Sequence, residues 1–255
     1  MRNSRFLPYM VAVCALLVIL LSPSIAKADP VCPAHTALPD LVSLVPCTIG
    51  DKTFTFGPVQ FSTLIRNSAG IFPFAASNFL LVPDGVSDPL NPTFSIIGSN
   101  AIVLRGTNAD ATLSMSFTAS TTDGSASLAG IDLSLAAYAT DAGPNIADTI
   151  QAVHSSNLVA NPLVLCVQDG GPSLLPGCVS GQPNDASASF ATPVSSESGT
   201  VTLLWSDDDL GEVGFTNAIL SFHEIPTATP EPGSLLLLGT GCLGALGVVG
   251  RRGLR

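Results

Sequence analysis

The stretch Thr112-Leu113-Ser114-Met115-Ser116-Phe117-Thr118 decides the fold, because apolar and hydroxyl side chains alternate in it without a break. Successive side chains of a β-strand point to opposite faces of the sheet, so the three apolar residues share one face and the hydroxyl residues share the other. A period of two with serine and threonine on one side is typical of a half-buried antiparallel strand. The stretch therefore predicts a strand with one face on a core and one face in water.

The same alternation recurs along the chain. It is present at Ile131, Leu133 and Leu135, at Phe54 and Phe56, and at Leu220 and Phe222. Further strands are predicted over Val59–Ile65, Ile102–Arg105, Leu163–Gln168 and Val201–Trp205, and turn sequences such as Pro83-Asp84-Gly85 and Asp123-Gly124 separate them. The prediction is an all-β fold, an antiparallel β-sandwich ectodomain over residues 29–225, with one short helix expected near Ile146–His154.

Composition excludes several classes of protein. The chain has 255 residues, of which only 11% are charged, and its formal net charge is −10. Binding to nucleic acid is not expected, because neutralising phosphates requires clustered lysine and arginine. An ordinary helical cytosolic enzyme would be richer in glutamate, lysine and arginine.

The N-terminus has the pattern of a secretory signal peptide. Arg2 and Arg5 precede an apolar run from Met10 to Leu21, and Ala26-Lys27-Ala28 supplies small residues for a signal peptidase. The alternative is a membrane anchor, but twelve apolar residues are too few for a hydrocarbon core that needs about 20. We therefore expect residues 1–28 to be a signal peptide, cleaved after Ala28.

The C-terminal region, residues 226–255, combines a proline-rich spacer with an apolar span. Pro230-Glu231-Pro232 is followed by an uncharged run from Ser234 to Gly250, and the chain ends with Arg251, Arg252 and Arg255. This run is close to the lower limit for one transmembrane helix, and the arginines are expected on the cytoplasmic side as a stop-transfer signal. A plain permanent anchor is the alternative.

These C-terminal residues resemble the PEP-CTERM protein-sorting tail. The resemblance covers residues 230–255 and depends on Pro230-Glu231-Pro232, the short Gly/Leu-rich span and the terminal arginines. Proteins with this tail occur mostly in bacteria that make extracellular polysaccharide. The resemblance implies export to the cell surface or matrix, transient anchoring in the inner membrane, and an exosortase-like membrane transpeptidase as partner, with release from the cell as one outcome.

The ectodomain also resembles the secreted all-β proteins that commonly carry this tail. The resemblance lies in Gly50-Asp51-Lys52-Thr53-Phe54-Thr55-Phe56 and in Trp205-Ser206-Asp207-Asp208-Asp209. It supports the fold class more than any function, because these proteins mostly lack an assigned activity.

Four cysteines lie in the exported body: Cys32, Cys47, Cys166 and Cys178. An even number in an oxidising compartment predicts disulfides, and three pairings are open. Closeness in sequence favours Cys32–Cys47 and Cys166–Cys178. A zinc site of four thiolates is the alternative, but neither spacing has the C-x2-C form that such sites use.

No motif selects a catalytic centre. His35, His154 and His223 lie in separate segments, and the chain has neither a G-x-S-x-G elbow nor a phosphate-binding loop. We expect these histidines to be exposed or hydrogen-bonded, and we expect no cofactor. Glycoside hydrolysis needs only two carboxylates, and nothing in the sequence selects a pair among the 18 acidic residues of the body.

One dense acidic cluster follows the strand Val201–Trp205. Asp207, Asp209 and Glu212 could supply oxygen ligands to Ca²⁺, but their spacing does not fit a calcium-binding loop. A solvated acidic turn is the prediction, with a calcium site as its alternative. Trp205 is the only tryptophan, so the chain is poor in the aromatic platforms that sugar-binding sites use.

The leading hypothesis is an exported surface or matrix protein with a structural or interaction role and no catalytic activity. A second hypothesis is a carbohydrate- or calcium-binding module of the polysaccharide matrix, and a third is a secreted glycosidase. Between residues 29 and 230 the chain has three basic and 18 acidic residues, a charge of −15, which favours solubility. Extracellular polysaccharide is the candidate partner that the resemblance of the tail implies, and nucleic acid is not expected.

Overall fold

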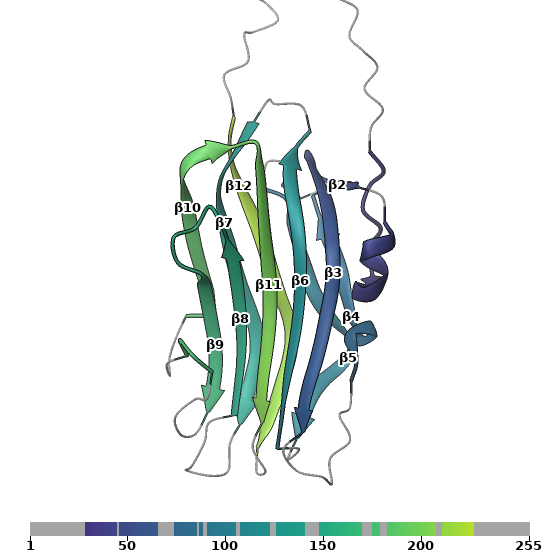
Figure 1. Ribbon diagram of the computed structural model, residues 1–255, viewed down its shortest axis with the longest axis vertical. Coiled ribbons are helices and arrows are strands. Elements are labelled where there is room, and N and C mark those ends of the chain that lie inside the picture. The colour runs from purple at the N-terminus through teal and green to yellow at the C-terminus, as the bar shows by residue number, and fades with distance from the viewer. Residues whose placement is uncertain are drawn as a thin grey trace, which may run out of the picture.

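The computed structural model shows two antiparallel sheets packed face to face (Figure 1). It describes residues 29–44, 46–65, 74–85, 87–88, 91–105, 108–122, 126–140, 148–169, 175–178, 183–207 and 211–226. The predicted signal peptide and the predicted sorting tail lie outside these residues. The all-β, two-sheet prediction is confirmed.

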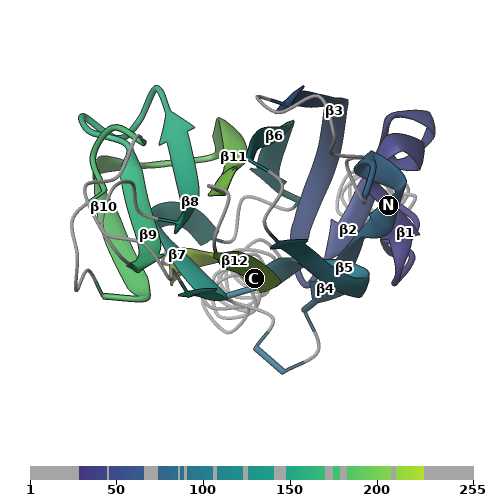
Figure 2. The same ribbon diagram turned by 90° about the horizontal axis from the view of Figure 1, so that it is seen from below.

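Each sheet has six strands. The first sheet has the order β1 (Thr36–Ala37), β4 (Phe79–Asp84), β5 (Thr93–Arg105), β12 (Glu212–Pro226), β7 (Ala126–Thr140) and β10 (Asp185–Val194). The second sheet has the order β2 (Cys47–Ile49), β3 (Lys52–Ile65), β6 (Ala109–Thr121), β11 (Ser196–Asp207), β8 (Asp148–Ser156) and β9 (Leu163–Asp169). Figure 2, which looks along the strands, shows the two sheets as separate layers.

The alternation of apolar and polar residues in the sequence corresponds to an alternation of buried and partly exposed side chains in the structure. In β6, Leu113, Met115 and Phe117 are buried, and the hydroxyl residues between them are partly exposed. The buried face of each sheet meets the other sheet, so burial of apolar surface drives the two sheets together. Full burial of one such side chain contributes about 1.5–3 kcal/mol.

Aromatic rings fill the space between the sheets. Phe54 of β3 and Phe222 of β12 meet edge to face, with ring centroids 5.3 Å apart. Phe79 of β4 lies 5.5 Å from Trp205 of β11, which is fully buried. Both contacts join one sheet to the other, and Trp205 is therefore a core residue rather than a surface platform.

The helix expected near Ile146–His154 is a wrong prediction. Residues 148–156 form β8, which pairs with β11 on one side and β9 on the other. Both faces of β8 are largely buried, since Thr149 and Gln151 are buried as well as Ile150 and Ala152. A strand buried on both faces loses its polar/apolar alternation, and this removed the signal that would have identified it.

Two short 3-10 helices lie at the side of the sandwich. η1 (Leu38–Ser43) buries Leu38 and Leu41 completely, and it contacts β3 and β4. η2 (Ala76–Asn78) precedes β4. In Figure 2 the purple turn of η1 lies beside β3, at the side where the core would otherwise be open.

The described chain enters and leaves at the same end of the sandwich (Figure 1). Asp29 accepts a hydrogen bond from Thr53 Oγ1, at 3.0 Å, near the start of β3. Pro226, the last residue of β12, pairs with Ala126 at the start of β7. In the sequence, the residues of the predicted sorting motif therefore follow shortly after β12, one of the two central strands of the first sheet.

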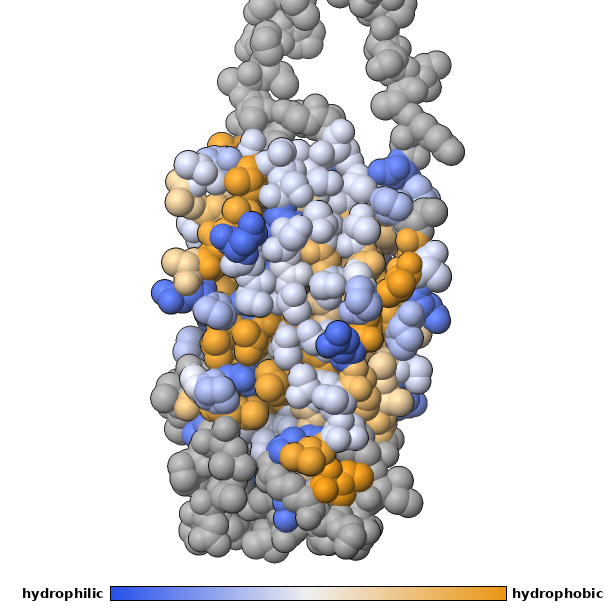
Figure 3. All heavy atoms as spheres, viewed as in Figure 1, coloured by the Kyte–Doolittle hydropathy of each residue, from blue (hydrophilic) through white to orange (hydrophobic). Residues whose placement is uncertain are grey.

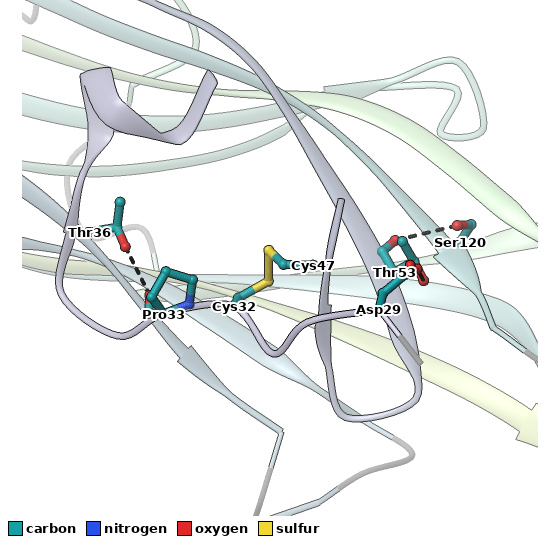
Figure 4. Close-up of a disulfide and its surroundings, with 7 residues drawn as sticks. All are labelled: Asp29, Cys32, Pro33, Thr36, Cys47, Thr53 and Ser120. Carbon is teal, nitrogen blue, oxygen red and sulfur yellow. Dashed lines mark hydrogen bonds between the residues drawn. A yellow bond between two sulfur atoms is a disulfide. The ribbon is translucent and has the colours of Figure 1, made fainter. Parts of the chain in front are cut away.

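A disulfide between Cys32 and Cys47 fixes the N-terminal segment (Figure 4). Their Cα atoms are 4.8 Å apart. The backbone also joins the two segments, because Cys32 N donates to Thr48 O at 3.0 Å and Thr48 N donates to Pro30 O at 2.8 Å. The disulfide and the hydrogen bonds together hold this segment along β2.

A second disulfide joins Cys166 of β9 to Cys178, with Cα atoms 5.5 Å apart. Gln151 of β8 donates from Nε2 to Pro176 O at 2.8 Å. The segment 175–178 is thereby held close to the outer side of β8. Both disulfides follow the pairing that closeness in sequence favours.

We expect reduction of either disulfide to lower the melting temperature by about 6–12 °C, since closing a loop of this length contributes about 3 kcal/mol through the unfolded chain. The sequence separations are 15 and 12 residues. The measurement is calorimetry on Cys32→Ser/Cys47→Ser and Cys166→Ser/Cys178→Ser, with the mass of the exported wild type before and after reduction. Free thiols at these four positions in the exported protein would refute the prediction.

Candidate functional site

Pro230, Glu231, Pro232 and the terminal arginines lie outside the described residues, as does the predicted span. Within the described part of the chain, no helix combines the length and the apolar character needed to cross a membrane.

The structure contradicts the prediction of a solvated acidic turn at Asp207. Asp207 is fully buried at the end of β11, where it pairs with Ala109 of β6. Asp208 and Asp209 lie outside the described residues, and Glu212 begins β12. Among the residues that the structure describes, no three His, Cys, Asp or Glu side chains gather as ligands of one metal ion.

Glu212 instead belongs to an exposed network with a cation and a phenol. Arg105 donates to Glu212 from Nε at 2.6 Å and also from its terminal nitrogen, and Tyr138 donates from its hydroxyl group. The hydrogen bond from Tyr138 lowers the pKa of Glu212, and Arg105 lowers it further. The same hydrogen bond raises the pKa of Tyr138. This network joins β5, β12 and β7 at one end of their sheet.

The histidines follow the prediction of exposed or hydrogen-bonded side chains. His154 is buried against Glu197, with His154 Nε2 and Glu197 Oε1 3.1 Å apart. His223 Nε2 lies 2.5 Å from Asp132 Oδ2 on the neighbouring strand, and His35 is exposed. The His154 ring points into the core, where it stacks on Phe117 at 5.8 Å, so it faces no open site.

A groove crosses the outer face of the second sheet. Its volume is about 520 Å³, within the range of ligand pockets. The lining residues come from four neighbouring strands and the start of the following loop: Thr55, Phe56, Gly57, Ser116, Phe117, Thr118, Ser155, Ser156, Asn157, Ser198, Gly199 and Thr200. The groove is therefore built by the sheet itself.

The register of the strands places the lining residues in two rows. In one row Thr118 of β6 pairs with Thr55 of β3 and with Ser198 of β11. In the other row Thr200 of β11 pairs with Ser116 of β6 and with Ser155 of β8. The two rows therefore run across the strands, and four strands span about 14 Å in that direction.

Between the two rows lie residues whose side chains point into the core. Phe117 of β6 pairs with Phe56 of β3 on one side and with Gly199 of β11 on the other. Both phenylalanine rings are buried, so these residues present mainly their backbone to the groove. The groove thus has hydroxyl walls and a backbone floor.

Gly199 is required because of the residues beneath it. A Cβ atom at this position would lie 2.5 Å from Cε1 of His154 and 3.1 Å from Cζ of Phe117. Gly57 is similarly restricted, because its Cβ would lie 2.1 Å from the hydroxyl of Ser116. The two glycines therefore allow the walls and the core to pack closely around the groove.

The groove has no ionisable residue among those that line it. Its polar groups are hydroxyls and the amide of Asn157, and one hydroxyl pair, Thr118 and Ser198, is hydrogen-bonded at 2.9 Å. In Figure 3, which faces this sheet, the centre of the face is mostly pale, the colour of residues such as serine and threonine. Sequence reasoning missed the groove: it recognised the outward hydroxyls but not their register across four strands.

Sequence reasoning also missed a buried ion pair between the two sheets. Lys52 of β3 contacts Asp51, which precedes it in the turn, and Glu224 of β12. The side chains of Lys52 and Glu224 are fully buried. A signal for this pair was present. Lys52 lies two residues before Phe54, and Glu224 lies two residues after Phe222. Residues two apart on a strand share a face, so both charged side chains fall on the inward face of their strands.

The C-terminal region matches the family model described as the PEP-CTERM protein-sorting motif, over residues 228–253. The chain therefore carries this motif, and the resemblance noted at residues 230–255 is confirmed. The motif indicates an exported protein that is sorted to the cell envelope.

No curated protein matches the chain. Among solved structures it is similar to the active domain of tailspike protein 4 of bacteriophage CBA120, at 12% identity over 70% of this chain and 20% of that one, with a TM-score of 0.22. It is also similar to the CBM22-1–GH10 modules of Clostridium thermocellum xylanase 10B, at 12% identity over 55% of this chain and 27% of that one, with a TM-score of 0.20. A family 11 carbohydrate-binding module from the same organism has 9% identity, over 68% of this chain and 89% of that one, with a TM-score of 0.16.

These similarities are too weak to assign a role. The chain spans about a fifth to a quarter of the length of the first two structures. TM-scores this low do not indicate a shared fold.

We expect Tyr138→Phe to raise the pKa of Glu212 toward its ordinary value, because the hydrogen bond from Tyr138 is the main cause of the lowered pKa. A lowered folded-state pKa stabilises the fold above the unfolded pKa, and this contribution is lost as the pH falls. The measurement is a carboxyl NMR titration of wild type and variant, with Arg105→Gln as the comparison. An unchanged titration of Glu212 in the phenylalanine variant would contradict the assignment.

Proposed function

Starting from its PEP-CTERM protein-sorting motif, we propose that this exported protein is a non-catalytic component of the cell envelope or extracellular matrix, and that its groove binds uncharged polysaccharide. The signal peptide directs the ectodomain, residues 29–225, across the membrane. The C-terminal span then holds the protein in the inner membrane until an exosortase-like transpeptidase acts at the Pro230-Glu231-Pro232 spacer.

The chemistry of the groove is the observation that carries the polysaccharide proposal. A hydroxyl group both donates and accepts hydrogen bonds, as the hydroxyl groups of a sugar do. The two rows place such groups on both sides of the groove: Thr55, Thr118, Ser198, Ser116, Thr200 and Ser155. A polysaccharide that lies along the groove can form hydrogen bonds with both rows.

The charge of the protein favours an uncharged ligand. The body carries a charge of −15, which repels anionic polymers, and the groove has no basic residue to offset that repulsion. A cationic ligand would require a carboxylate, and none lines the groove. A neutral glycan matches both conditions.

A binding role also fits this groove better than hydrolysis. Glycoside hydrolysis requires two carboxyl groups on either side of the scissile bond. The lining residues include no aspartate or glutamate, and the buried Glu197 is directed to His154. We therefore favour a protein that holds a glycan without cleaving it.

We expect the purified protein to be retarded in native gels that contain a neutral polysaccharide such as dextran, xylan or a β-glucan, and not in gels that contain alginate. Thr200→Glu should weaken binding at least about tenfold, which is 1.4 kcal/mol, because it places a charge on the groove wall. Thr202→Glu is the matched control, since Thr202 lies on the same face of β11 but outside the groove. Retardation by none of the neutral polymers, or an equal loss in both variants, would refute the proposal.

We also expect the tail to be removed or exchanged in the native bacterium. The span from Ser234 to Gly250 contains five glycines, each costing a helix about 1 kcal/mol relative to alanine, which fits a temporary tether. The intact mass of the mature surface protein should therefore lack Arg255 and most of the span. In a host without the sorting enzyme the full-length protein should stay in the membrane. An intact C-terminus on the native surface protein would make the span a permanent anchor.

A further inference from the structure

The end of the sandwich from which the tail leaves contains an unusual set of three ionisable groups. The ammonium group of Lys52 contacts Oδ1 of Asp51 and Oε1 of Glu224. Lys52 begins β3, the first long strand, and Glu224 lies near the end of β12, the last strand. The three groups therefore join the two sheets and the two ends of the exported body.

The amine and the carboxyl group are held in a dry environment. Both the Lys52 and the Glu224 side chains are fully buried, while the Asp51 side chain is 26% exposed. The next inward residues on the two strands, Phe54 and Phe222, pack against each other and close the core side of the pair. A charged pair gains little from such surroundings, because burial removes the hydration of both ions.

The groups are also held in fixed positions. Gly50 has a φ of 61° and starts the two-residue turn that joins β2 to β3. The carbonyl oxygen of Asp51 in this turn accepts hydrogen bonds from the backbone nitrogen of Thr122 at 3.2 Å and from its hydroxyl at 2.9 Å. Asp51 and Lys52 are therefore anchored to the end of β6, and Glu224 is anchored by its pairing with β7.

We propose that Lys52 and Glu224 become joined by an intramolecular amide bond between Nζ and the side-chain carboxyl carbon, with Asp51 as the proton carrier. No external reagent is needed. The reaction consumes one ammonium and one carboxylate group and releases one water molecule. The product is a covalent link between the first long strand and the last strand.

The reaction proceeds in balanced steps. The ammonium proton moves to the Glu224 carboxylate, which leaves a neutral amine and a carboxylic acid. The nitrogen lone pair attacks the carboxyl carbon while the Asp51 carboxylate accepts a proton from the nitrogen. The tetrahedral intermediate then collapses, its hydroxyl group takes the proton from Asp51, and water leaves.

Two features of the site favour this reaction. Burial raises the pKa of Glu224, Lys52 opposes this effect, and the negative charge of Asp51 reinforces it, so the acid form that the attack requires is promoted. Groups held in contact within one molecule react with effective concentrations of about 10⁵–10⁸ M. Such concentrations offset the unfavourable equilibrium of amide formation in water.

The test is the mass of the purified, folded, full-length protein after reduction of its disulfides. We expect the sequence mass less one water, allowing for signal-peptide removal. After digestion with trypsin, cleavage at Arg66 and Arg105 separates residues 52 and 224 in a linear chain, so a fragment containing both demonstrates the amide. A folded wild type with the unmodified mass, or with no joined fragment, would overturn the proposal.

Variants separate this reaction from other losses of water. Lys52→Arg keeps the positive charge but cannot form the amide, and Asp51→Asn keeps both partners but removes the proton carrier, so both should retain the linear mass. Glu212→Gln is the matched control, which should still lose water. A succinimide at an Asp-Gly sequence such as Asp84-Gly85 also loses water, but it joins no distant fragments and would persist in Lys52→Arg. A joined fragment in Asp51→Asn would overturn the role of Asp51.

Discussion

Contact between the aromatic side chains of the two sheets is the interaction on which the rest of the structure depends. Phe54 and Phe117 come from the second sheet, and Phe94 and Phe222 come from the first, so each ring buries surface against residues distant in sequence. This contact fixes which face of every strand is inward. It thereby fixes which face carries the serine and threonine side chains, and the groove is a consequence of the core.

The fold class could be predicted because the burial of one face of a strand produces a pattern in neighbouring residues of the sequence. Leu113, Met115 and Phe117 alternate with hydroxyl residues because one face of β6 is buried and the other is not. This alternating pattern is lost where both faces of a strand are buried, as in β8, and the helix expected there was wrong. The order of the strands in each sheet could not be predicted from neighbouring residues, because it depends on contacts between segments more than 100 residues apart, such as β5 with β12.

The same distinction explains which parts of the candidate site were predictable. The disulfides follow from short loops and an oxidising compartment, which are properties of neighbouring residues. The groove requires that Thr55, Thr118 and Ser198 stand side by side, and these residues lie on three strands whose register only the assembled sheet defines. The buried position of Asp207 was equally hidden, since three consecutive aspartates in isolation indicate a solvated turn.

The distribution of charge gives the two ends of the sandwich different roles. The described body has two basic residues, and each is committed to carboxylates: Arg105 to Glu212 at one end, and Lys52 to Glu224 at the other. The exposed pair near Arg105 contributes little, because water screens it. The buried group at Lys52 lies near the C-terminal end of β12, after which the sorting tail follows in the sequence, and Lys52 pairs with Ile49 of β2, the strand that begins at Cys47. If the tail is held in the membrane as proposed, any force applied through it reaches the body at β12. This strand is hydrogen-bonded to β5 on one side and to β7 on the other, and Lys52 joins it to the N-terminal hairpin.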